Sequence, residues 1–99
     1  MVAKFGINNG QPLSLNIDYS LPDDILNYKI LIFNVNRYSK NANMITFNTF
    51  GNAHFICNSG PEGAKWGFFI DISNKKIKLE SKDNDNGEPY VDITGLIHV

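Results

Sequence analysis

Residues 65–81 read KWGFFIDISNKKIKLES, and this stretch decides the class of fold. In its first half, hydrophobic side chains occupy every second position: Trp66, Phe68, Ile70 and Ile72. In its second half, Ile77 and Leu79 alternate with lysine and glutamate. A period of two is typical of a β-strand that buries one face. Because Ser and Asn favour turns, we predict two strands joined by a turn at residues 73–75.

Strand patterns recur along the chain at spacings of about ten residues, with Gly, Pro and Asn between them. The predicted strands are residues 13–19, 28–35, 44–49, 54–58, 65–73, 77–82 and 91–99, the last interrupted by Gly95, which we interpret as a bulge. Residues 28–35, YKILIFNV, are hydrophobic on both faces and predict a central strand. Pro22 begins the only helix candidate, one short turn through Leu26.

These patterns predict an all-β fold, a single antiparallel β-sandwich (jelly-roll-like) of about seven or eight short strands. The 99 residues are enough for one domain, so we assign residues 1–99 to a single β-sandwich domain. The hydrophobic fraction of 42% is sufficient for a packed core.

Composition excludes several classes of partner. The net charge is −1, so the chain lacks the positive field that holds nucleic acid. The longest apolar run, residues 30–33, is far too short for membrane insertion. The first residues, MVAKFGINNG, lack the apolar centre of a signal peptide, which favours a cytoplasmic protein or a domain cut from a longer one. The single cysteine, Cys57, excludes an internal disulfide and a multi-cysteine zinc site.

The chain has 14 Asn residues, and eight Lys residues against one Arg. An amide group both donates and accepts hydrogen bonds, which is why Asn-rich surfaces suit sugar-binding β proteins. The alternative is an AT-rich genome, whose codons favour Asn, Lys and Ile together. Both interpretations remain open at this stage.

Residues 82–89, KDNDNGEP, look like a calcium-binding loop. An EF-hand loop needs an oxygen ligand at its first position and Gly at its sixth. Placing Gly87 at the sixth position puts Lys82 at the first, where its charge repels the ion. We therefore predict no metal site, and we interpret Asn86-Gly87 as a hairpin turn between two strands.

The sequence offers no catalytic constellation, and we predict a protein that is not an enzyme and needs no cofactor. His54 and Cys57 are three residues apart, which on a strand places them on opposite faces. No nucleophile elbow, P-loop or dinucleotide fingerprint is present. Asp71 and Asp92 fall on separate strands, and a glycosidase pair formed by them is the remaining enzymatic alternative.

Candidate ligand-binding residues lie in predicted loops and at strand ends. Residues 36–43, NRYSKNAN, form a predicted polar loop, and loops on a sandwich often carry binding residues. The candidates are Asn36, Arg37, Tyr38, Asn41, Asn48, His54 and Trp66. The Trp66 ring is either part of the core or, beside the Gly-rich loop that precedes it, a platform for stacking sugars.

The order of features resembles the C-terminal β-sandwich of bacteriophage tail fibres and related receptor-binding proteins. The resemblance rests on YKILIF at residues 28–33, MITF at residues 44–47, the strand pair of residues 68–79, and DITGLI at residues 92–97. It implies a homotrimer in the virion tail that binds a host-surface glycan or a receptor protein.

The leading hypothesis is thus a non-enzymatic binding domain that recognises a cell-surface glycan or receptor as part of a tail fibre or similar adhesion structure. The alternative is a small cytoplasmic inhibitor or immunity-type protein that blocks a protein partner. Its acidic segments, Asp23-Asp24 and residues 83–88, would then face a basic surface on the target.

Overall fold

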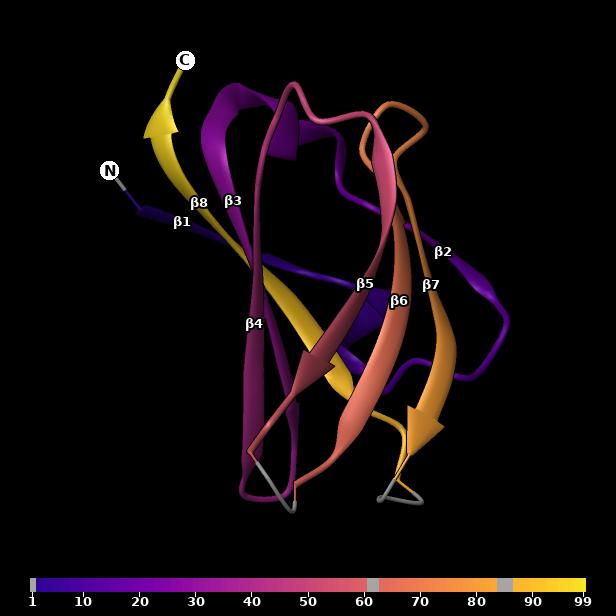
Figure 1. Cartoon of the computed structure of the whole chain (residues 1–99). Coiled ribbons are helices and arrows are strands. Elements are labelled where there is room, and N and C mark those ends of the chain that lie inside the picture. The colour runs from indigo at the N-terminus through magenta and orange to yellow at the C-terminus, as the bar shows by residue number, and fades with distance from the viewer. Residues whose placement is uncertain (1, 61–62, 84–86) are drawn as a thin grey trace.

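The computed structural model describes residues 2–60, 63–83 and 87–99. Within them, eight strands form two four-stranded antiparallel sheets that pack as a sandwich (Figure 1). The first sheet has the order β1 (Val2–Gly6), β8 (Tyr90–His98), β3 (Tyr28–Arg37) and β4 (Lys40–Phe47). The second sheet has the order β2 (Asp18–Ser20), β7 (Lys76–Asp83), β6 (Lys65–Asp71) and β5 (Asn52–Asn58). The predicted all-β sandwich is confirmed.

The core lies between the two sheets. The largest fully buried side chains include Phe33 from β3 and Trp66 and Phe68 from β6. Each such side chain contributes about 1.5–3 kcal/mol when it leaves water. Ile70, Ile77 and Leu79 are also fully buried. The alternation of hydrophobic residues in residues 65–72 and 77–79 predicted one buried face on each of these strands, and that prediction is confirmed.

Strands from the two ends of the chain lie side by side in the first sheet. β8 pairs with β1 on one side and with β3 on the other, and Gly6 lies opposite Asp92. β3 lies between β8 and β4, so its predicted central position is confirmed. Two short 3-10 helices lie in the connections, η1 (Asn8–Gly10) and η2 (Asp23–Asn27). The second confirms the predicted helical turn after Pro22, and Ile25 anchors it in the core.

The predicted strand at residues 13–19 is wrong for most of its length. Only Asp18–Ser20 forms a strand. Leu13 is buried, but Leu15 and Ile17 are exposed. Asn16 has a φ of 62°, in the left-handed region, which turns the chain and ends the alternation. Asn adopts this region more readily than most residues, so an Asn inside an alternating pattern can mark a break rather than a strand.

The predicted polar loop at residues 36–43 is also wrong. β3 continues to Arg37, β4 begins at Lys40, and only Tyr38 and Ser39 form the turn. The Asn side chains of this segment lie on strands, where a solvent-facing side tolerates polar residues. Residues 36–43 therefore form the tip of a long hairpin of β3 and β4, and not a loop.

The prediction that the strands on either side of KDNDNGEP pair with each other as a hairpin is wrong. β7 and β8, on either side of it, belong to different sheets and pair with other strands. Residues 84–86 of this segment lie outside the described residues. In the described residues, no group of three His, Cys, Asp or Glu side chains is placed to hold a metal ion.

Gly95 lies opposite Ala3 on one side and Leu31 on the other, so the predicted bulge is wrong. A Cβ atom built on Gly95 would lie 2.7 Å from Cγ of Tyr28, closer than carbon atoms can pack. The glycine is therefore required by the Tyr28 ring, which covers the strand at this point.

We expect Gly95→Ala to lower the free energy of unfolding by about 1–3 kcal/mol, because the Tyr28 ring must move to admit the new methyl group. Thermal and urea unfolding measure this loss. Gly51→Ala is the matched control, since a Cβ on Gly51 meets nothing within 4 Å. Equal stability of the two variants would contradict the packing argument.

Candidate functional site

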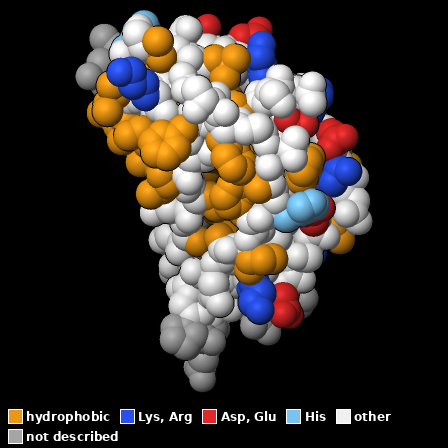
Figure 2. Space-filling view, turned by 45° about the horizontal axis from the view of Figure 1, so that its top comes forward, with side chains coloured by type: hydrophobic (Ala, Val, Ile, Leu, Met, Phe, Trp, Pro, Cys, Tyr) orange, Lys and Arg blue, Asp and Glu red, His pale blue; other side chains and the backbone are white. Residues whose placement is uncertain are grey.

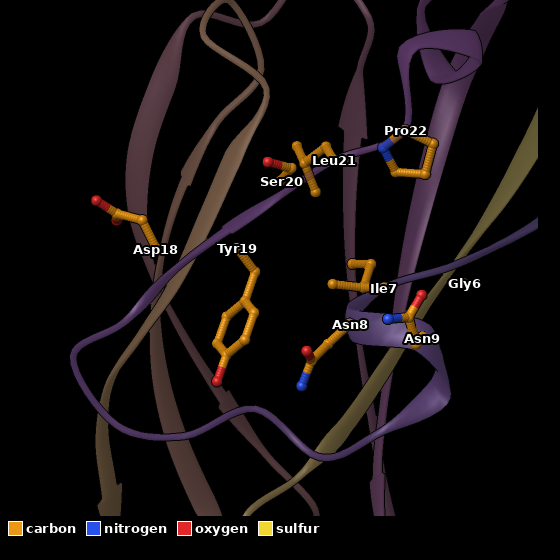
Figure 3. Close-up of a pocket in the computed structure, with 9 residues that line it drawn as sticks. All are labelled: Gly6, Ile7, Asn8, Asn9, Asp18, Tyr19, Ser20, Leu21 and Pro22. Carbon is orange, nitrogen blue, oxygen red and sulfur yellow. The ribbon is translucent and has the colours of Figure 1, made fainter.

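A groove opens between η1 and β2, at the side of the sandwich where β1 and β2 are the edge strands (Figure 3). Its volume is about 400 Å³, within the usual range for small-ligand sites. Its lining comprises Gly6, Ile7, Asn8, Asn9, Asp18, Tyr19, Ser20, Leu21 and Pro22. These residues are separated in sequence and are brought together by the two sheets.

The groove combines an apolar base with one aromatic ring. Ile7 and Leu21 belong to the hydrophobic core and are almost fully buried. The half-buried Tyr19 ring extends from β2 into the groove region (Figure 3). The backbone N–H of Ser14 donates a hydrogen bond to the Tyr19 hydroxyl (2.8 Å). That bond fixes the ring and leaves the hydroxyl proton free to be donated.

Polar groups line the rest of the groove. Nδ2 of Asn8 donates to the carbonyl oxygen of Pro12 (2.9 Å), so its side-chain oxygen still accepts. The Asn9 side chain makes no hydrogen bond within the described part of the chain. Oδ1 of Asp18 lies 3.6 Å from Nζ of Lys78. Nζ of Lys76 donates a hydrogen bond to the Ser20 hydroxyl (3.2 Å). The Asn9 amide is therefore the group most available to a ligand.

The backbone of η1 is held in an unusual conformation. Asn8, Asn9 and Gly10 all have left-handed φ angles, of 54°, 54° and 78°. This region costs a non-glycine residue roughly 1 kcal/mol or more, although Asn tolerates it best. Two backbone hydrogen bonds close the turn, from Gly10 to Ile7 (3.1 Å) and from Gln11 to Asn8 (3.0 Å). Strained backbone of this kind clusters at functional sites.

Sequence reasoning missed this groove. The local signal was Asn8-Asn9-Gly10, a run of the residues that most readily adopt positive φ. The approach of β2 to η1 has no local signal, because it depends on which sheet each strand joins.

The groove offers hydrogen-bonding groups of several kinds. Among the described residues that line it, Asp18 is the one carboxylate, and none is a His, Cys, Lys or Arg. Because Asp18 is paired with Lys78 (3.6 Å), the described lining leaves no unpaired charge for a charged ligand. The arrangement fits a neutral ligand with hydroxyl groups and an apolar face.

Four of the predicted site residues meet at the tip of the β3–β4 hairpin. Asn36 lies opposite Asn41 on the neighbouring strand. Nη2 of Arg37 donates to the Tyr38 hydroxyl (3.0 Å), and the guanidinium carbon lies 4.3 Å from the ring centroid. The Arg37 side chain also packs against Gly87. Tyr38 is 79% exposed, so the tip presents an aromatic ring to solvent.

The other three predicted residues lie elsewhere. Asn48 follows β4 at the opposite end of the hairpin, where its Nδ2 donates to the carbonyl oxygen of Leu26 (3.1 Å). His54 lies on the exposed face of β5, with Nδ1 2.6 Å from Oε1 of Glu80. Trp66 is 0% exposed, so its proposed stacking role is wrong and the alternative, core packing, is confirmed. The predicted residues do not form one site.

Cys57 and His54 project from opposite faces of β5, as predicted. Cys57 is buried, whereas the His54 side chain is 70% exposed. Burial raises the pKa of the Cys57 thiol from 9.0 to about 11, because a thiolate would lose its hydration. The thiol therefore stays protonated in the folded chain.

We expect this thiol to reduce stability at high pH. Between pH 9 and about 11 the unfolded chain loses the Cys57 proton while the folded chain keeps it, so the free energy of unfolding falls as the pH rises. Urea unfolding at a series of pH values measures the slope. Cys57→Ala removes this contribution, and identical slopes for variant and wild type would refute it.

Comparison with known proteins finds no matching protein family, no matching curated protein and no matching solved structure. The resemblance to tail-fibre domains therefore stays an expectation from sequence. In the described residues, no helix is both long and apolar enough to cross a membrane.

Proposed function

We propose that the chain is a non-enzymatic binding domain that holds a neutral, hydroxyl-rich ligand, a glycan of the cell surface, in the groove between η1 and β2. The observation that carries the proposal is the Tyr19 ring beside the apolar base of the groove, opposite the amide-bearing turn of η1. The apolar face of a sugar ring packs on an aromatic ring. Amide groups match hydroxyl groups because both donate and accept hydrogen bonds.

The wider setting that we propose is a phage tail fibre or a similar adhesion structure. Its support is the resemblance of residues 28–97 to receptor-binding domains of that class. A virion tail would be the location in that setting, and a host-surface glycan or receptor the partner.

We expect Tyr19→Ala to weaken glycan binding by about tenfold or more, because the ring supplies the apolar contact and a hydroxyl donor. A glycan array finds the ligand, and calorimetric titration of the best hit measures the affinity. Tyr38→Ala is the matched control, because Tyr38 is an exposed tyrosine outside the groove.

The two tyrosine variants separate the groove from the hairpin tip. Loss of binding in Tyr38→Ala alone would move the site to the tip that the sequence predicted. An array without a single hit would overturn the proposal. Circular dichroism of each variant establishes that its fold is intact.

A second candidate function is self-association through the outer face of the first sheet. On this face Ile30 lies opposite both Phe47 and Leu96, and Ile32 lies opposite Ile45. Ile45 and Phe47 are 65% and 63% exposed. On the side of the molecule that Figure 2 presents, hydrophobic side chains adjoin one another at the surface. Adjoining exposed hydrophobic residues often mark a protein interface, and the homotrimer implied by the tail-fibre resemblance would bury these.

We expect Phe47→Glu to shift the chain from oligomer to monomer, because a charge on this face cannot be buried without a partner. Light scattering measures the molar mass. Ile56→Glu is the matched control, since Ile56 is 68% exposed on the second sheet.

A wild-type monomer at all concentrations would contradict self-association and favour the inhibitor or immunity-type alternative, with this face available to another protein. In that alternative the acidic segment Asp23-Asp24 contributes less than the sequence implied, because Asp23 is already paired with Lys75 (2.9 Å).

A further inference from the structure

A second hollow lies directly beside the groove. Its volume is about 240 Å³, and it is lined by Gly6, Ile7, Gly10, Gln11, Asn36, Tyr90, Val91 and Asp92. Gly6 and Ile7 line both the hollow and the groove, so the two spaces adjoin at the end of β1. By itself the hollow is smaller than most small-ligand sites. It therefore fits better as a continuation of the groove than as a separate site.

The hollow repeats the chemistry of the groove. Tyr90 is 39% exposed and lies opposite Asn36 on the neighbouring strand, so a ring and an amide are adjacent. Ile7 and Val91 supply a buried apolar base. Oδ1 of Asp92 accepts a hydrogen bond from Nδ2 of Asn34 (2.8 Å). Each space thus has one tyrosine, at least one amide and one carboxylate over an apolar base.

Gly6 lines both spaces and contributes no side chain to either. A Cβ atom on Gly6 would meet nothing within 4 Å, and Gly6 has no positive φ. Neither packing nor backbone conformation therefore requires glycine here.

We propose that the ligand is a linear, uncharged oligosaccharide that lies across the end of β1, with one sugar unit beside Tyr19 and the next beside Tyr90. This inference rests on the proposed function and names its ligand class. A chain is indicated because two similar subsites adjoin. An uncharged chain is indicated because the carboxylate of the groove, Asp18, is already paired with Lys78 (3.6 Å), the Asp92 carboxylate of the hollow disfavours an anion, and neither lining includes a Lys or Arg.

The test measures affinity against chain length. The probes are linear glucose, mannose and N-acetylglucosamine oligomers from one to about six units, titrated by calorimetry against the whole chain. In the series that binds, we expect affinity to rise about tenfold between one unit and two or three units, because the second ring adds a stacking contact.

Two variants assign that gain to the second hollow. Tyr90→Ala should remove the gain for longer oligomers and leave the affinity for the single unit unchanged, because Tyr90 lines only the second hollow. Gly6→Val should also remove the gain, and it should weaken binding of the single unit as well, because Gly6 lines both spaces. Valine suits a strand, and a Cβ atom at Gly6 meets nothing within 4 Å, so the fold should be retained. Gly51→Val and Tyr38→Ala are the matched controls, since both sites lie outside the two spaces.

Each outcome decides between the two proposals. If one unit binds as tightly as longer oligomers, or if the gain survives in both variants, the extended site is refuted while the groove remains a sugar site. If sialylated or phosphorylated sugars bind more tightly than neutral ones, the uncharged class is wrong. If no oligomer of any series binds, the extended site and the proposed function both fail.

Discussion

The antiparallel pairing of β8 with both β1 and β3 is the contact on which the rest of the structure depends. In the described residues β8 is the one strand that pairs with β1, and it joins β1 to the centre of the first sheet. The register of this pairing sets Gly6 opposite Asp92. Because η1 follows β1 directly, the same register positions the strained turn relative to β2. The proposed ligand groove is therefore a product of strand pairing, not of a local loop.

The abundance of Asn acquires a partial explanation from the backbone. Asn8, Asn9 and Asn16 occupy left-handed positions, where Asn is better tolerated than most residues. Asn74 stabilises the turn after β6, because its amide and its backbone N–H both donate to the Asp71 carboxylate. These roles are conformational and do not depend on a ligand. They show why residue composition alone could not separate a sugar-binding surface from a codon bias.

Sequence reasoning predicted the parts of the fold that depend on burial. In residues 65–81 hydrophobic side chains alternate, and burial follows that alternation. Residues 28–35 are hydrophobic on both faces, but whereas Leu31, Phe33 and Val35 are buried in the core, Ile30 and Ile32 are half-buried on the outer face. The prediction failed at residues 13–19 because one Asn in the left-handed region outweighed the alternation. It also failed at residues 36–43, where Asn side chains lie on a solvent-facing strand. The candidate groove was missed because its two walls, residues 6–9 and 18–22, meet only after the strand order is known.

The pairing of β1 with β8 also has a consequence for folding during synthesis, because it joins the first strand of the domain to its last. β1 leaves the ribosome before every other strand of this domain, and β8 leaves after all the others. Until then β1 has both edges unpaired, and β3 lacks one of its two neighbouring strands. Contacts between segments so distant in sequence form slowly, and an unpaired strand edge promotes aggregation until its partner strand has bound. A chaperone that shields an exposed strand edge would have its longest period of contact with residues 2–6.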